Sequence, residues 1–286
     1  MKGIAAAPGA GTVLNALATH TGAAFGIDVD TTATVELDGD ADAVDGEIAA
    51  APDGDTRLIE RCVELTTDRF GEGEGGWVRT ESEVPMAAGL KSSSAAANAT
   101  VLATLDALGV RVVDPAGERE LGGEPHETAV DEITALEACR IGVDAARDVG
   151  VTITGAFDDA AASMTGDVVV TDNDTDALLA RSTRDWEVLV WTPPERAYSA
   201  DADVDRCQDI AAMAELVEEL ALDGRFGEAM TVNGLAYSAA LGFATDPAVE
   251  AMPHAEGVSL SGTGPSVVAV GGGDSLEPVR ELWAAR

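Results

Sequence analysis

The sequence predicts an α+β protein, with helices packed on a mixed or antiparallel sheet. Segments with the pattern of strands and of helices occur along the whole chain without the strict alternation of βαβ units. Hydrophobic residues make up 46% of the 286 positions, and the mean hydropathy is +0.07, so the chain can bury a core. Because the pattern changes near residue 165, we expect two domains, 1–165 and 166–286.

In the first part, strands are expected where short apolar runs end at turn residues, and helices where apolar residues recur every three or four positions. Residues 38–55 are acidic and contain Gly and Pro, which predicts a loop or hairpin. The expected strands are 3–7, 33–37, 77–85 and 151–154. The expected helices are 56–69, 92–109, 127–149 and one that follows a turn within 155–164.

The second part repeats both patterns at a different spacing. Strands are expected at 167–171 and 187–192, and an apolar hairpin at 258–271. Helical stretches are expected near 202–222, 225–240 and 275–285.

Charge is the most unusual property of the composition. The chain has 52 acidic and 17 basic residues and a formal charge of −35, which argues against nucleic acid as a partner. Only Lys2 and Lys91 are lysines. This acid-rich, lysine-poor composition is typical of adaptation to high salt, where a Debye length of about 3 Å at 1 M screens self-repulsion. An unusually acidic protein of an ordinary cytosol is the alternative.

The cysteine spacing and the lengths of the apolar segments indicate the cellular compartment in which the protein is expected. Cys62, Cys139 and Cys207 are far apart and fit neither a zinc nor a redox spacing, so we expect reduced thiols. No window has the ~18 apolar residues of a membrane span, and no signal-peptide pattern opens the sequence. We therefore expect a cytoplasmic protein that does not bind membranes.

Several common catalytic motifs are absent from the sequence. A Walker-type phosphate loop needs Gly-Lys-Ser/Thr, but Lys2 follows a methionine and Lys91 a leucine. Gly71, Gly73 and Gly76 have the G-x-G-x-x-G spacing, yet they precede an expected strand, which predicts a simple turn. There is no H-E-x-x-H zinc motif and no G-x-S-x-G nucleophile elbow.

The strongest candidate segment is 85–98, where a Pro/Gly loop leads directly into a helix. Ser92, Ser93 and Ser94 form its expected first turn, followed by alanines that let a ligand approach closely. Free backbone N–H groups and the helix dipole make such a terminus an anion site, and Lys91 adds a positive charge. The alternative is a serine-capped helix that packs through its alanines.

Two further segments fit a phosphate-transfer site. Residues 259–266 break the expected hairpin with a Gly-rich turn that a ligand can approach closely, although an ordinary hairpin turn has the same composition. Residues 154–163 set Asp158 and Asp159 at the start of a small-residue helix. One carboxylate can accept a hydroxyl proton, as in kinases, while a solvated pair at the helix start is the alternative.

Together, the segments 89–98, 154–160 and 261–266 resemble archaeal-type shikimate kinases, members of the GHMP superfamily of galactokinase, homoserine kinase, mevalonate kinase and phosphomevalonate kinase. The resemblance implies a two-domain GHMP kinase fold with a ribosomal protein S5-like N-terminal domain and a ferredoxin-like C-terminal domain. It implies ATP and Mg²⁺, and phosphorylation of the 3-hydroxyl of shikimate in aromatic amino-acid biosynthesis. A homoserine or mevalonate-type kinase and a non-catalytic nucleotide-binding protein are the alternatives.

The resemblance also implies roles for particular residues. Asp158 matches the superfamily's catalytic aspartate, with Asp159 as its rival, and Lys91 assists. Asn15, Asp158 and Asp159 are expected at the substrate, and Ser93 at Mg²⁺. The positions expected to bind ATP are Pro85, Met86, Ala87, Ala88, Gly89, Leu90, Lys91, Ser92, Ser93, Ser94, Ala95, Gly262, Thr263 and Gly264.

Four positions are less regular. The superfamily often supplies a second Mg²⁺ ligand from the following helix, which makes Glu137 the candidate, although an ion pair with a neighbouring arginine is the structural alternative. Ala87 and Ala88 replace a more usual glycine or basic residue. Shikimate's carboxylate should meet an arginine; the sequence leaves open which one, and Arg196, after Pro193-Pro194, is one candidate.

Overall fold

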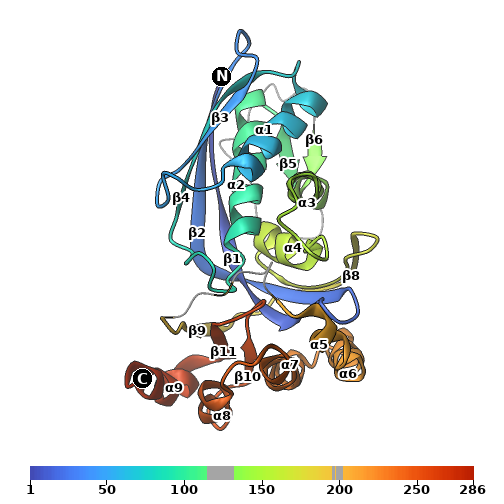
Figure 1. Ribbon diagram of the computed structural model, residues 1–286, viewed down its shortest axis with the longest axis vertical. Coiled ribbons are helices and arrows are strands. Elements are labelled where there is room, and N and C mark those ends of the chain that lie inside the picture. Colours follow the sequence, from blue (N-terminus) through green and yellow to red (C-terminus); the bar gives the residue numbers. More distant parts are fainter. Residues whose placement is uncertain (115–131, 195–196, 198–201) are drawn as a thin grey trace.

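The computed structural model describes residues 1–114, 132–194, 197 and 202–286. Its long axis runs from a large sheet flanked by helices to a smaller sheet with its own helices (Figure 1). The two parts are continuous, because segments of both contribute to a shared hydrophobic core.

The larger sheet is built around β2. This strand pairs antiparallel with β1 on one side, and on the other with β4 through residues 31–38 and with β7 through residues 21–25. Outer strands complete the two edges, β3 parallel to β4 and β8 antiparallel to β7. The strands are β1 (Lys2–Leu14), β2 (Thr21–Asp38), β3 (Val44–Ile48), β4 (Gly75–Ser82), β7 (Val168–Asp172) and β8 (Ala177–Ser182).

Four helices pack together on this sheet (Figure 1). The alanine-rich helix α2 lies closest, against β1 and β2, and Gly3 has no room for a side chain because Ala103 of α2 touches it. A short parallel pair, β5 (Arg111–Val113) and β6 (Glu132–Thr134), lies beside them. The helices are α1 (Arg57–Phe70), α2 (Ser92–Leu108), α3 (Ala135–Val149) and α4 (Phe157–Thr165).

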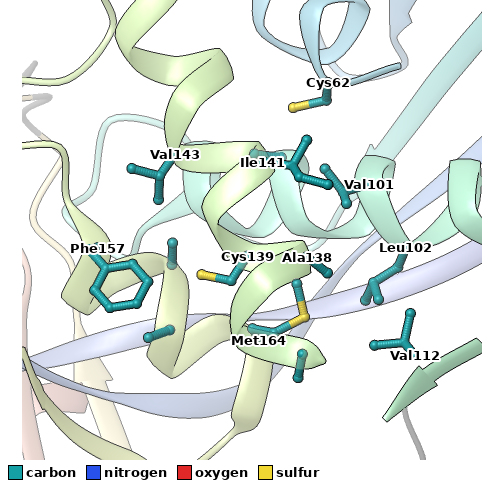
Figure 2. Packing of buried hydrophobic residues seen from close by; sticks show 14 of the residues in the cluster. Cys62, Val101, Leu102, Val112, Ala138, Cys139, Ile141, Val143, Phe157 and Met164 are labelled. Atoms are coloured by element: carbon teal, nitrogen blue, oxygen red, sulfur yellow. The ribbon is translucent and has the colours of Figure 1, made fainter. Parts of the chain in front are cut away.

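The helices meet in a continuous apolar core. Figure 2 shows Val101 of α2, Ile141 of α3 and Phe157 of α4 converging there, all buried. Cys62 and Cys139 also lie in this core and are unpaired, and burial raises the pKa of both thiols. Phe157 therefore anchors the start of α4, next to the two aspartates of interest.

The smaller sheet has the order β10-β11-β9 and is antiparallel throughout. Its core joins that of the larger sheet, since Phe25 of β2 and Val168 of β7 cluster with Phe226, Met230 and Val268. The turn between β10 and β11 is thereby placed beside the first half of the chain. The elements are β9 (Glu187–Trp191), α5 (Val204–Gln208), α6 (Ala211–Leu222), α7 (Phe226–Leu241), α8 (Asp246–Ala251), β10 (Gly257–Leu260), β11 (Val267–Gly271), η2 (Gly273–Leu276) and α9 (Glu277–Ala284).

Most expected elements are present, and the differences have local causes. Strand β3 forms within the expected loop 38–55 because it pairs with β4, and pairing with β7 likewise creates β8. Residues 151–154 are not a strand. The helix expected over 127–149 begins at Ala135, after strand β6, and its residues 127–131 lie outside the described part. The sequence also did not predict α8.

The domain boundary near residue 165 stays a prediction. Strands β7 and β8 follow that residue and are hydrogen-bonded into the larger sheet, so the change to the smaller sheet comes at β9. Within the described ranges, no helix is both long and apolar enough to cross a membrane.

A buried ion cluster links β8 to the residue after β5 and to the residue before β7. The Arg181 guanidinium donates to both carboxylate oxygens of Asp114 at 2.7 and 2.5 Å and to Asp167 at 2.6 Å. The three side chains are only 10%, 3% and 13% exposed. Charges buried this deeply depend on their partners, because an unpaired buried charge is costly.

We expect Arg181→Met to lower the free energy of unfolding by about 3 kcal/mol, because it removes the guanidinium that pairs with two buried carboxylates. Urea unfolding at constant KCl measures the change. Arg57→Met is the control: it removes a solvent-exposed pair with Asp55 and should leave the unfolding midpoint almost unchanged. Equal effects of the two substitutions would contradict this account.

Candidate active site

A cavity of about 480 Å³ brings together residues from distant parts of the chain. Its walls come from the end of β1, the loop before α2, the first turns of α2 and α4, and the β10–β11 turn. Twelve predicted site residues line it: Asn15, Met86, Ala87, Gly89, Lys91, Ser92, Ser93, Ser94, Asp158, Asp159, Gly262 and Thr263. Pro85, Ala88, Leu90, Ala95 and Gly264 belong to the same segments but do not line the cavity.

The loop before α2 is held by the β10–β11 turn. Gly89 has φ +75°, and a Cβ there would lie 2.9 Å from the carbonyl oxygen of Gly264, so only glycine fits. The Ser261 hydroxyl donates to the Gly89 carbonyl at 2.8 Å. Ala87 also has a positive φ, +54°, which is unusual for a residue with a side chain, and its carbonyl accepts from the Ala197 backbone at 3.2 Å. The loop is therefore fixed despite its alanines.

Helix α2 begins at the cavity wall without a side-chain cap. Its N-cap residue, Lys91, is in the left-handed region with φ 63°, and no acidic residue lies in the first turn. Helix α3 differs, because Thr134 and Glu137 form a capping box there. The first N–H groups of α2 lack such a partner and, with the helix dipole, favour an anion.

Lys91 and Asp159 form a buried ion pair in this cavity. The Lys91 ammonium lies 2.7 Å from a carboxylate oxygen of Asp159, and the side chains are 7% and 18% exposed. A Cβ on Gly262 would lie only 3.3 Å from the Lys91 nitrogen, so the β10–β11 turn closes over the lysine. The ion pair holds the Lys91 ammonium at the part of the cavity wall that the first turn of α2 also forms.

Asp158 is the more deeply buried aspartate, 4% exposed. Its carboxylate accepts from the Asn173 side chain at 2.8 Å, and its backbone N–H donates to the same side chain at 3.2 Å. Burial, with the nearby Asp159 charge, raises the pKa of Asp158 to about 7, against the opposing effects of Lys91 and Asn173. A carboxyl group that titrates near neutrality can exchange a proton with a substrate hydroxyl.

The structure separates Asp158 from Asp159 by environment. Asp159 is committed to Lys91, whereas Asp158 keeps one side on the cavity and the other against Gly22 and Asn173. Sequence reasoning missed both supports. Gly22 looks like an ordinary strand glycine, and Asn173 lies in a polar turn after β7 that carries no catalytic motif.

Asn15 lines the cavity, but its side chain binds the protein itself. Its amide donates to the Gly262 carbonyl at 2.8 Å, and its oxygen accepts from the Leu17 backbone at 2.9 Å. The Asn15 backbone N–H in turn donates to Asn233 of α7 at 2.9 Å. Asn15 therefore holds the β10–β11 turn in place at this end of the cavity.

Comparisons with known proteins agree with this geometry. The sequence model for the GHMP kinases N terminal domain matches residues 57–123. A shikimate kinase of Halobacterium salinarum is 60% identical over 283 residues, which cover 99% of this chain and 93% of the relative. A shikimate kinase of Methanosarcina mazei is 48% identical and covers 99% of this chain and 90% of its own. The chain belongs to the shikimate kinase family of GHMP kinases.

The fold agrees as well. The crystal structure of the Methanococcus jannaschii mevalonate kinase superposes with a TM-score of 0.71 at 12% identity, covering 99% of this chain and 95% of that one. The predicted GHMP kinase fold and the predicted family are thus confirmed. As a member of the shikimate kinase family, the protein is a phosphotransferase, and ATP is the expected phosphoryl donor.

Glu137, a predicted Mg²⁺ ligand, does not line the cavity of this shikimate kinase family member. The Glu137 carboxylate accepts from the Thr134 backbone at 3.1 Å and from its hydroxyl at 2.7 Å, which lowers the pKa of Glu137. Its side chain is exposed at the start of α3 and caps that helix instead of meeting a cation. We therefore leave it out of the proposed site. Arg196 lies outside the described residues.

We expect Asp158→Asn to stabilise the protein at alkaline pH. Because the folded-state pKa is raised, the folded protein binds this proton more tightly, and wild-type stability falls as pH rises from about 4 to about 7. The variant has no carboxyl group to titrate here, so above pH 7 its free energy of unfolding should exceed that of the wild type by about 1–4 kcal/mol. Urea unfolding at pH 5.5 and 8.5 measures it, and an equal gain at both values would contradict the assignment.

We expect Gly22→Ala to displace Asp158, because a Cβ there would lie 2.5 Å from its carboxylate oxygen. Misplacing a catalytic group by about 1 Å costs about 100-fold in rate, so kinase activity should fall strongly while ATP binding persists. Gly39→Ala, at the other end of β2 with nothing within 4 Å, is the control. Full activity of Gly22→Ala would show that the position of Asp158 is unimportant.

Proposed function

We propose that the protein transfers the γ-phosphoryl group of ATP to the 3-hydroxyl of shikimate. The observation that carries the proposal is the meeting of a buried carboxyl group, Asp158, with the uncapped start of α2 and Lys91 in one cavity. The choice of shikimate among possible alcohols is supported by relatives that carry this activity in their names and match almost the whole chain.

Asp158 acts on the acceptor hydroxyl. As the bond between the hydroxyl oxygen and the γ-phosphorus forms, the bond from phosphorus to the ADP oxygen breaks, and the hydroxyl proton passes to Asp158. This role needs the ionised carboxylate, so turnover should rise with pH through about 7. Asp159 orients Lys91 in this scheme and does not take the proton.

Lys91 and the start of α2 bind the phosphates. The ammonium and the first-turn N–H groups of Ser92, Ser93 and Ser94 provide positive potential in a protein of net charge −35. The same groups oppose the charge that develops on the transferring phosphoryl group. The fixed loop at Gly89 and the turn at Gly262 bring the backbone close to these phosphates.

The oxygen atoms of the cavity suit Mg²⁺. The serine hydroxyls of the cavity are hard oxygen ligands of the kind that Mg²⁺ prefers. Among the described residues, no group of three acidic, His or Cys side chains could hold a metal ion. We propose Ser93 as one ligand. When bound, Mg²⁺ supplies charge neutralisation at the phosphates.

We also propose a cytoplasmic location and no nucleic-acid partner. All three cysteines are buried and unpaired, as expected where thiols stay reduced. The charge of −35 opposes contact with a phosphate backbone.

The proposal predicts ADP release from Mg·ATP that depends on shikimate, measured in high KCl, with homoserine and mevalonate as comparison acceptors. Asp158→Asn should lower turnover by about 100-fold or more, with ATP still bound. Loss in Asp159→Asn combined with survival in Asp158→Asn would exchange the two roles. Turnover only on another alcohol would overturn the substrate, and ATP binding without any turnover would overturn the catalytic proposal.

A further inference from the structure

Asn173 contacts Asp158 directly through its side chain. It follows β7, is 1% exposed, and does not line the cavity. Its amide nitrogen donates to the Asp158 carboxylate at 2.8 Å, while its oxygen accepts from the Asp158 backbone at 3.2 Å and from the Thr171 hydroxyl at 2.7 Å. One side chain therefore holds both the backbone and the carboxyl group of the proposed base.

The turn that carries Asn173 is itself fixed from two directions. The Asn173 backbone N–H donates to the His20 carbonyl at 3.0 Å, which joins it to the turn before β2. Its carbonyl accepts from Arg147 of α3 at 3.2 Å. Arg147 also binds both carboxylate oxygens of Asp176 at 2.6 and 2.7 Å, and Arg140 donates to the Asp176 carbonyl at 2.8 Å. Asn173 is thus a rigid support.

The chemistry of this contact requires an amide. The side chain must donate to the Asp158 carboxylate and accept from the Asp158 N–H at the same time, and an ionised aspartate has no donor. A donor to a carboxylate favours its ionised form, which burial opposes. The other neighbours of the carboxyl group are Lys91, Asp159 and Gly22, from the loop before α2, from α4 and from β2. The Asp159 backbone N–H also lowers the pKa of Asp158, but less than the Asn173 amide does. Neither Lys91 nor Gly22 replaces the amide, because Lys91 pairs with Asp159 and glycine has no side chain.

We propose that Asn173 is a positioning residue for phosphoryl transfer: it fixes the Asp158 carboxyl group at the cavity through hydrogen bonds to its carboxylate and to its backbone N–H. This inference rests on the proposed role of Asp158. It assigns a function to a turn that the ATP-binding and substrate motifs do not include.

The test compares Asn173→Ala and Asn173→Asp with the wild type in kcat, KM and the pH dependence of kcat/KM for shikimate. In Asn173→Ala we expect kcat to fall about 10-fold or more near pH 7, while KM for ATP changes little. The acid limb of its kcat/KM profile should move up by about one pH unit. Asn173→Asp keeps the shape and both acceptor contacts but adds a negative charge. Its acid limb should therefore move further than that of Asn173→Ala.

A larger shift in Asn173→Asp than in Asn173→Ala distinguishes a positioning role of Asn173 from a purely structural one. If Asn173 only held the fold, Asn173→Asp would be the milder change, because it preserves the contacts with Asp158 N–H and Thr171. Asn98→Ala is the matched control: Asn98 is equally buried and donates to the Ala160 carbonyl of α4 at 2.8 Å, without touching Asp158. It should lower the melting temperature and leave the acid limb in place.

The outcomes for the two proposals differ. If Asp158→Asn keeps wild-type turnover, the proposed role of Asp158 fails, and this inference fails with it. If Asp158→Asn is inactive but Asn173→Asp retains the wild-type acid limb and kcat, only the inference about Asn173 is overturned. A folding defect in Asn173→Ala, seen as a lower melting temperature, leaves the comparison of Asn173→Asp with Asn98→Ala as the deciding measurement.

Discussion

The removal of the Asp158 carboxyl group from water is the constraint on which the rest of the site depends. Burial makes the ionised form costly and moves its titration towards neutral pH. The surroundings limit this effect without abolishing it: Asn173 supplies a donor, and Lys91 supplies a nearby positive charge that Asp159 holds in place. A carboxyl group in water would stay ionised at neutral pH, and one buried without these partners would stay protonated.

The second constraint is charge. A protein of net charge −35 has to bind two anionic substrates, so the positive potential must be local. The uncapped start of α2 and one buried lysine provide it, and both lie at the wall of the same cavity. Helix α3 shows the contrast, since Thr134 and Glu137 form a capping box at its start. The different starts of α2 and α3 are the reason why we propose α2 as the helix that binds the phosphates.

The third constraint is close approach. The loop before α2 and the β10–β11 turn come from opposite ends of the chain, and they touch because Gly89 leaves room for the carbonyl of Gly264. Asn15 and Ser261 add hydrogen bonds across the same junction. The smaller sheet thus takes part in the site directly, through a turn that covers Lys91.

The sequence by itself located the loop and helix start at 85–98, the Asp158–Asp159 pair, the Gly-rich turn and most helices, because each depends on local composition, periodicity or a contiguous motif. Tertiary structure alone decided what these residues do. Asn15 became a link to Gly262 and Asn173 a partner of Asp158, since hydrogen bonds between residues far apart in the chain leave no periodic signal. Glu137 is the exception, because its capping box with Thr134 is a local pattern that the sequence analysis did not use. Strands β3 and β8 were equally invisible, because a short edge strand exists only through its neighbour in the sheet.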